Sequence, residues 1–204
     1  MIRYETKPVV FNLDDFCEEI MTAESWKILL ELKRRYHKLK ITMFTIPFLC
    51  TEEWLRMVKK TYPWIEMHYH GSNHSDRDEW LARTEWDAPY SSYFFRGFKA
   101  PWWRLGQPSA DMLDKKGFVI SACRGYFDVN ASRVYHFNIG NKHIHKVWYE
   151  REAFHSVHSH VQHQKTYDGL PDGDLLDQLL SAFPKNSRFL FISELFNPKS
   201  QLQL

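Results

Sequence analysis

The sequence contains little cysteine, no long apolar run and almost no net charge. Its three cysteines, Cys17, Cys50 and Cys123, are widely spaced and odd in number, so we expect buried reduced thiols rather than a disulfide framework. No stretch approaches the ~18 apolar residues of a membrane span, and residues 1–5 show no signal-peptide core, so we expect a cytoplasmic protein or a processed mature chain without a membrane partner. The formal charge of +2 provides no polyanion-binding surface, so no nucleic-acid partner is expected.

The chain does contain an ordinary globular composition with many aromatic rings. Hydrophobic residues make up 44% of the 204 residues and charged residues 25%, which is enough to bury a full core. No linker, repeat or low-complexity tract divides the sequence, so residues 1–204 are predicted to form a single domain. Aromatic residues reach 16%, with eight Trp and ten Tyr. Most should lie in the core, but Trp and Tyr near a polar site also suit stacking on sugar rings.

Segments with strand-like and helix-like patterns alternate along the chain. Strands are expected at Val9–Leu13, Ile41–Ile46, Ile65–His68, Phe98–Ala100, Phe118–Ser121, Phe154–His158 and Phe189–Ile192, and helices at Glu24–Tyr36, after Thr51, after Ser75, at Ser109–Lys116 and at Gly173–Ala182. This order predicts an α/β fold with a mostly parallel sheet and right-handed crossovers. In barrel-like α/β folds the carboxyl ends of the strands share one face, and sites form there.

Paired carboxylates and paired histidines follow two of the expected strands. Asp14 and Asp15 follow the first strand, and His70 and His74 follow the third. One Asp and two His at this spacing can supply three ligands to a divalent metal ion and leave a position open for water. The second Asp is then free to take a proton from that water. The pattern therefore indicates a metal-dependent hydrolase.

Two further clusters fall at the same predicted end of the sheet. Residues 101–103, Pro-Trp-Trp, follow the fourth strand, and a His-rich segment lies towards the end of a late strand. If that segment is extended, His158 and His160 face one side and His155 the other. Either His158 or His160 can serve as a general acid, a role that suits imidazole.

In this order, the motifs resemble those of the polysaccharide deacetylase family, the NodB-like carbohydrate esterases. The family's Thr-Phe-Asp-Asp-Gly, His-x-x-x-His, Arg-x-Pro-aromatic-Gly and hydrophobic-His motifs are matched in turn by residues 12–16, by His70 and His74, by residues 98–103, and by Val157-His158 or Ser159-His160. The resemblance covers about residues 9–195. It implies a compact, distorted (β/α) barrel, a divalent metal ion (Zn²⁺ above all), and removal of acetyl groups from N-acetylated sugars.

The resemblance also implies a role for individual residues. The metal ligands would be Asp15, His70 and His74, the general base Asp14, the partner of that base Lys99, and the general acid His158 or His160. Apart from the resemblance, Trp102, Trp103 and Arg104 are candidate substrate contacts. The backbone N–H of Trp102 stands where the family holds the oxyanion of the tetrahedral intermediate.

Three departures from the family pattern are visible. Phe16 replaces the Gly after the paired Asp. Lys99 replaces the Arg that pairs with the base, and a Lys cannot make the bidentate contact of an Arg; Arg96 or Arg104 can take that place instead. The Asp and Trp that orient the acid His in the family have no clear match, and Asp128 is the nearest candidate.

The expected function is hydrolysis of an N-acetyl group, with O-acetyl as the less favoured case, on a sugar or polysaccharide. Two alternatives stay open: a degenerate deacetylase fold that binds carbohydrate or a protein partner, and a metal-dependent amide or ester hydrolase acting on a non-sugar substrate. Tyr69 and Asn73 are further candidates for substrate contacts. His68 is a weaker candidate ligand, because it lies six residues rather than four before His74. The oligomeric state is left open.

Overall fold

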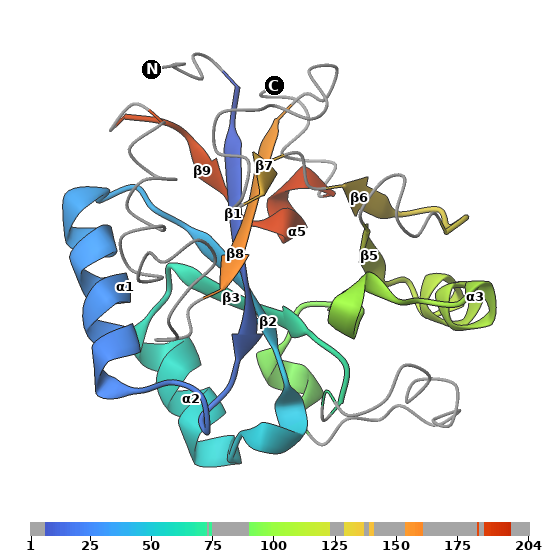
Figure 1. The fold of residues 1–204 in the computed structure, drawn as a ribbon, viewed down its shortest axis with the longest axis horizontal. Coiled ribbons are helices and arrows are strands. Elements are labelled where there is room, and N and C mark those ends of the chain that lie inside the picture. Colours follow the sequence, from blue (N-terminus) through green and yellow to red (C-terminus); the bar gives the residue numbers. More distant parts are fainter. Residues whose placement is uncertain are drawn as a thin grey trace.

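The computed structural model describes residues 7–72, 74, 90–122, 129–136, 139–140, 154–160, 183 and 186–196. These residues contain one nine-stranded sheet whose pairings are all parallel (Figure 1). Along the sheet the strands follow the order β6 (Val134–His136), β5 (Val119–Ala122), β4 (Gly97–Lys99), β3 (Ile65–Tyr69), β2 (Ile41–Thr45), β1 (Val9–Phe16), β8 (His155–His160) and β7 (Ile139–Gly140), and β9 (Phe189–Leu190) pairs with β1.

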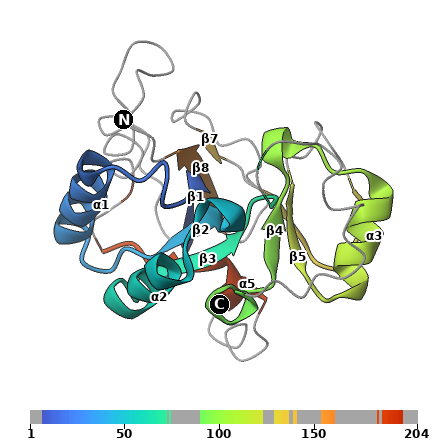
Figure 2. The same cartoon turned by 90° about the horizontal axis from the view of Figure 1, so that it is seen from below.

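The helices lie outside the sheet, apart from one short helix at the carboxyl end of the chain. Figure 2 shows α1 and α2 beside β1 to β3, and α3 beside β4 and β5. The Thr51 side chain caps α2 by accepting a hydrogen bond from the Trp54 N–H at 3.2 Å, which confirms the predicted helix start. The helices and 3₁₀ turns are α1 (Ala23–Arg35), η1 (Pro47–Leu49), α2 (Glu52–Thr61), η2 (Ser91–Tyr93), η3 (Pro101–Trp103), α3 (Gln107–Lys115) and α5 (Ile192–Leu195).

The two edges of the sheet are joined by the chain itself. Strands β6 and β7 stand at opposite ends of the strand order, yet only residues 137–138 separate them in sequence. Three peptide links reach at most about 11 Å, so the sheet must curl until its edges nearly meet. Accordingly, the Tyr135 hydroxyl on β6 accepts hydrogen bonds from the Asn12 amide on β1 at 2.7 Å and from the Ser156 hydroxyl on β8 at 2.9 Å. The predicted distorted α/β barrel is confirmed.

Successive side chains of each strand point alternately to the outer and the inner face of this barrel. On the outer face, Phe11 of β1 packs with Leu29 of α1 and Leu55 of α2 in one core. All three are fully buried, and each contributes about 1.5–3 kcal/mol of hydrophobic stabilisation. The outer residues of β4 and β5 pack against α3 in a second core. On the inner face, β1 presents the buried polar residues Asn12 and Asp14.

Helix α5 fills one end of the barrel. Its Ile192 and Leu195 join Val10 in an inner apolar cluster. The Ile192 N–H donates a hydrogen bond to the Thr42 hydroxyl at 3.1 Å. Because Ile192 begins this helix, strand β9 stops short, and the predicted strand Phe189–Ile192 is wrong in its second half.

Several other boundaries differ from the prediction. Strand β1 extends through Phe16 and β8 through His160, beyond their predicted ends. Strands β6 and β7 are not predicted at all, because three and two residues carry too little pattern to be recognised. The predicted helices after Ser75 and at Gly173–Ala182 lie outside the described residues.

Two remaining expectations concern cysteines and membranes. Cys17 and Cys50 are buried free thiols, and burial raises the pKa of Cys17 to about 11, so this thiol is not primed as a nucleophile. Cys123 lies outside the described residues. In the described part of the chain, no helix has the length and apolar character needed to span a membrane.

Gly97 on β4 has no room for a side chain. A Cβ at this position would lie 1.8 Å from Nδ1 of His68, and the fully buried His68 ring is held between Phe44 and Phe95. We expect Gly97→Ala to lower the free energy of unfolding by about 3 kcal/mol or to prevent folding, because it overpacks a buried site. Urea unfolding monitored by circular dichroism measures this loss.

The matched control is Gly106→Ala. The nearest heavy atom to a Cβ at Gly106 is 3.7 Å away, so the change should cost less than about 1 kcal/mol, as expected for a helix N-cap position. Equal losses in the two variants would contradict the steric explanation.

Candidate metal centre

A β-bulge brings two neighbouring carboxylates to the same side of β1. Between Leu13 and Phe16, three steps along β1 match two steps along β2. The extra residue leaves Asp15 with a φ of 59°, a left-handed conformation that Asp tolerates better than most residues. In a regular strand Asp14 and Asp15 would face opposite sides. With the bulge, both carboxylates approach His70, whose Nε2 lies 3.9 Å from Asp14 Oδ2 and 3.3 Å from Asp15 Oδ1.

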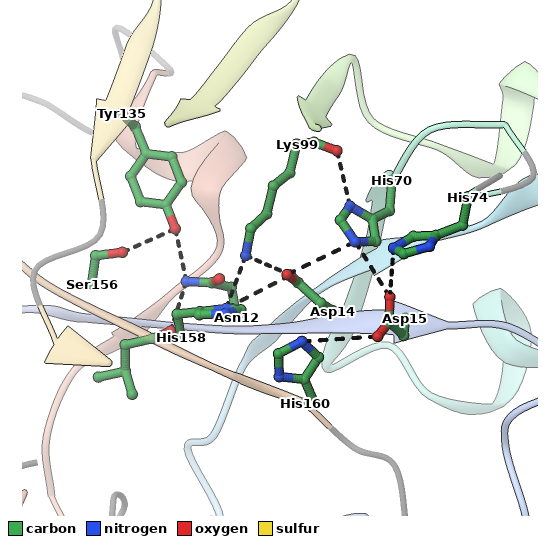
Figure 3. Close-up of polar contacts among 11 residues, drawn as sticks. Asn12, Asp14, Asp15, His70, His74, Lys99, Tyr135, Ser156, His158 and His160 are labelled. Carbon is green, nitrogen blue, oxygen red and sulfur yellow. Dashed lines mark hydrogen bonds and ion pairs between the residues drawn. The ribbon is translucent and has the colours of Figure 1, made fainter. Parts of the chain in front are cut away.

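His70 and His74 come from the segment after β3 and meet at Asp15. The Nδ1–H of His70 donates to the Lys99 carbonyl at 2.9 Å, so its Nε2 is the nitrogen that faces Asp15. His74, with a φ of 62°, places its Nε2 3.3 Å from the same Asp15 Oδ1. Figure 3 shows both rings directed at this carboxylate. Asp15, His70 and His74 are called the metal triad below.

The spacing of the metal triad fits a divalent ion. Ligands bonded at about 2.1 Å to a tetrahedral ion such as Zn²⁺ lie about 3.4 Å from one another, and both imidazole nitrogens lie 3.3 Å from Asp15 Oδ1. The Lys99 carbonyl that holds the other nitrogen of His70 is the kind of partner that orients metal-binding imidazoles. Three protein ligands also leave a coordination position for water or substrate.

The electrostatics of the metal triad favour added positive charge. Burial alone would lower the pKa of His70, but the carboxylates of Asp14 and Asp15 raise it above its usual value. Burial alone would raise the pKa of Asp15, but a hydrogen bond and the charge of His70 lower it. Burial and the neighbouring His70 lower the pKa of His74. A bound dication would supply the positive charge that His70 otherwise takes up as a proton.

The other carboxylate, Asp14, is paired with a buried lysine. Lys99 reaches from β4 and donates from Nζ to Asp14 Oδ1 at 2.6 Å and to His158 Nδ1 at 2.9 Å. Burial alone would raise the pKa of Asp14, but the Lys99 ammonium, helped by the neighbouring histidines, holds it well below its usual range. Asp14 is therefore an ionised carboxylate held in place beside the metal triad (Figure 3).

The two candidate acid histidines lie on β8. His160 pairs in register with Asp14 on β1. His155, by contrast, packs against Phe183, a residue of the core on the outer face. His158 is buried, and burial together with the Lys99 charge lowers its pKa well below the usual value. The His160 side chain is 29% exposed, and its Nε2 lies 3.8 Å from Asp15 Oδ2. Of the two rings, His160 is the more accessible.

Two tryptophans and strained backbone border these side chains. Trp102 is 52% exposed, and its ring centroid lies 4.6 Å from that of His74. The Trp103 ring lies 5.2 Å from His158 and 3.8 Å from the Nζ of Lys99. Among the described residues, the non-glycine positions with positive φ are Asp15, His74, Trp102 and Trp103. Backbone strain of this kind is often found at functional sites.

Several other candidates lie away from the centre. Tyr69 is buried and stacks on Phe94 at 4.4 Å, so it is a core residue rather than a substrate contact. His68 is buried with its Nε2 2.7 Å from Glu66, so this nitrogen is engaged away from the metal triad. Arg96 is exposed and donates to the Lys116 carbonyl, and Lys99 takes the place beside Asp14. Arg104 is half-buried directly after η3. The candidates outside the described residues are Asn73 and Asp128.

Asn12 and Tyr135 support the centre and carry no sequence signal of their own. The Asn12 amide donates to the Val157 carbonyl at 2.6 Å and to the Tyr135 hydroxyl at 2.7 Å. The first bond fixes β1 against β8 two residues before Asp14, and the second joins β1 to β6. Because the contacts join residues more than a hundred positions apart, no local pattern could reveal them.

No family model and no curated protein sequence matches the chain, but its structure is similar to solved carbohydrate deacetylases. A peptidoglycan N-acetylglucosamine deacetylase shares 17% identity and a TM-score of 0.58 over 93% of this chain and 87% of that one. The Xyl-CE4 domain of a xylanase from the hindgut metagenome of Trinervitermes trinervoides shares 15% identity and a TM-score of 0.59, over 96% of this chain and 92% of that one. A CE4 pseudoenzyme from Bacillus anthracis shares 14% identity and a TM-score of 0.59, over 95% of this chain and 66% of that one.

At these identities the similarity shows the fold. The chain has the fold of the CE4 polysaccharide deacetylases, as the motif resemblance implies. Enzymes and a pseudoenzyme share this fold, so activity has to be argued from the residues of the centre.

Removing one ligand should strongly weaken metal binding. We expect the metal-stripped protein to bind Zn²⁺ tightly in a calorimetric titration, and His70→Ala to weaken that binding by more than about 100-fold, because it removes one of three ligands. His155→Ala is the control, since this histidine lies on β8 with its ring against Phe183. Unchanged affinity in His70→Ala, or an equal loss in His155→Ala, would contradict the assignment.

Proposed function

We propose that the chain is a metal-dependent carbohydrate deacetylase that hydrolyses the N-acetyl group of a sugar or polysaccharide. The observation that carries the proposal is the metal triad beside a separate ionised carboxylate, Asp14, whose Oδ2 lies 3.9 Å from His70 Nε2. A structural metal site needs ligands only, whereas a hydrolase also needs a base. The structural neighbours support an acetylated sugar as substrate: one is a peptidoglycan N-acetylglucosamine deacetylase, and another, a family 4 carbohydrate esterase, was solved with acetate.

The divalent ion, proposed to be Zn²⁺, would be held by Asp15, His70 and His74. When bound, it would polarise the acetyl carbonyl and lower the pKa of water towards neutrality. Asp14 would act as the general base that accepts the proton of the attacking water. Its lowered pKa makes it a weak base, so this mechanism requires the acidified water that a divalent ion would supply. Lys99 keeps Asp14 ionised and fixed in orientation.

We assign protonation of the departing amine to His160. The ammonium of Lys99 can only donate, so His158 accepts at Nδ1, and the Trp103 ring packs against it at 5.2 Å. We therefore assign His158 the role of positioning Lys99. His160 lies at the carboxyl end of β8, is more exposed and sits beside Asp15, so it is the ring that reaches the leaving group.

Residues of η3 and the position after it would form the substrate side. The N–H groups of Trp103 and Arg104 donate to the carbonyls of Ala100 and Pro101, so the Trp102 N–H is the donor of this turn that we assign to the oxyanion. The exposed Trp102 ring offers a face for stacking on a sugar, and Arg104 can add a polar contact. The solved neighbours align over 93% and 96% of the chain, so we treat residues 1–204 as one catalytic domain.

A carbohydrate-binding protein without catalysis is the second candidate. The Bacillus anthracis neighbour is a pseudoenzyme, and a mutant of it has restored activity. The observation that favours this candidate is the lysine at position 99 in place of the family's arginine. We favour the enzyme because Lys99 lies 2.6 Å from Asp14, so the charge contact that the base needs is present.

Asp14→Asn should separate catalysis from metal binding. We expect the zinc-loaded protein to release acetate from N-acetylglucosamine oligomers and Asp14→Asn to lower kcat by about 10²–10⁴-fold, because the general base is lost. Metal content should stay at the native level, since Asp14 is not a ligand. Acetate release at the native rate by Asp14→Asn would remove the base assignment, and no release by the native protein would favour the binding protein.

The choice of leaving group should identify the acid. We expect His160→Asn to lose about 10²–10⁴-fold in kcat on an N-acetyl sugar but to hydrolyse 4-nitrophenyl acetate at close to the native rate, because a nitrophenolate needs no proton to leave. His158→Asn should slow both substrates, because it disturbs Lys99 and through it Asp14. The reverse pattern would make His158 the acid.

A further inference from the structure

A second group of ligand-type side chains lies beside the metal triad. Asp14, His158 and His160 each offer one ligand atom, and these atoms all lie within 4.8 Å of one another, as the atoms of the metal triad do. We call these three residues the second triad. Each triad contains one carboxylate and two imidazoles, so donor chemistry alone does not tell an ion which triad to occupy.

Lys99 distinguishes the two triads. Its Nζ lies 2.6 Å from Asp14 Oδ1 and 2.9 Å from His158 Nδ1, and those two atoms are 3.7 Å apart. The ammonium therefore bridges a carboxylate oxygen and an imidazole nitrogen of the second triad (Figure 3). A cation bridging the same two atoms would have to share this space, and its charge would repel the ammonium.

The surroundings of Lys99 keep the ammonium in this position. The side chain is fully buried, and Nζ lies 3.8 Å from the centroid of the Trp103 ring and 5.1 Å from that of Phe44. Both rings attract the positive charge through their faces. Displacing Lys99 would also remove the nearest counter-charge of Asp14, a buried carboxylate, and that is costly.

We propose that Lys99 is the built-in cation of the second triad, so that the centre binds one divalent ion and not two. The inference rests on the proposed function in one respect, that the resident ion belongs to the metal triad. It adds a role for the lysine at the place of the family's arginine. By keeping metal away from Asp14, Lys99 preserves that carboxylate as a base, whereas an ion on Asp14 would turn the base into a ligand. Lys99 is a positioning residue.

The test is metal stoichiometry. Metal-stripped native protein and variants are dialysed against excess Zn²⁺, and bound zinc is measured by atomic emission. We expect one ion per chain in the native protein, two in Lys99→Gln, and one in Lys99→Arg, which keeps the positive charge. The double variant Lys99→Gln/His160→Ala should return to one, because it removes a ligand of the second triad. Circular dichroism checks the fold, and Lys99→Met serves if Lys99→Gln does not fold.

Each outcome decides the inference. Two ions in the native protein, or one ion in both folded neutral variants, would overturn the role of Lys99. In that case acetate release by the native protein would still stand, so the proposed function survives separately. If neither the native protein nor Lys99→Gln bound an ion, both the role of Lys99 and the proposed function would be overturned. One ion in the native protein and two in Lys99→Gln, lost again with His160→Ala, would support the inference.

Discussion

Two adjacent carboxylates, Asp14 buried and Asp15 partly buried, are the constraint on which the rest of the centre depends. Asp14 and Asp15 are neighbours in sequence, and the bulge in β1 turns both towards His70. An unpaired buried charge costs several kcal/mol, so each carboxylate requires a cation. Asp14 has the Lys99 ammonium. Asp15 has two imidazoles and, in our proposal, a divalent ion. In our proposal the same residue type serves as base at one position and as ligand at the next, because the two cations differ.

The barrel supplies these partners from separate strands. Lys99 comes from β4, His70 follows β3 and His158 lies on β8, directly beside β1. Because the paired strands are parallel, their carboxyl ends meet on one face, and α5 packs its Ile192 and Leu195 inside the barrel. The aromatic rings around Lys99 and the hydrogen bond from His70 to the Lys99 carbonyl tie the base and the metal triad to one residue.

Residue type and order along the chain were readable from the sequence, but local geometry was not. The Asp pair, the His pair, residues 101–103 and the late histidines could be assigned to one face because parallel strands end together, whereas Lys99 was identified only through the motif resemblance. The bulge could not be predicted, since Phe16 rather than Gly follows the pair and Asp15 itself adopts the positive φ. The contact between Lys99 and His158 joins residues 59 positions apart, beyond any local pattern. The end of β9 depends on the docking of α5, a tertiary contact.

The comparison with solved structures places active and inactive proteins on the same fold, so the central claim concerns where an ion sits. The most direct measurement is an anomalous difference map, recorded at the zinc edge, from crystals of the zinc-loaded protein. Our account predicts one peak about 2.1 Å from the Asp15 carboxylate and from the Nε2 atoms of His70 and His74. A peak between Asp14 and His158, or no peak in this region, would contradict it.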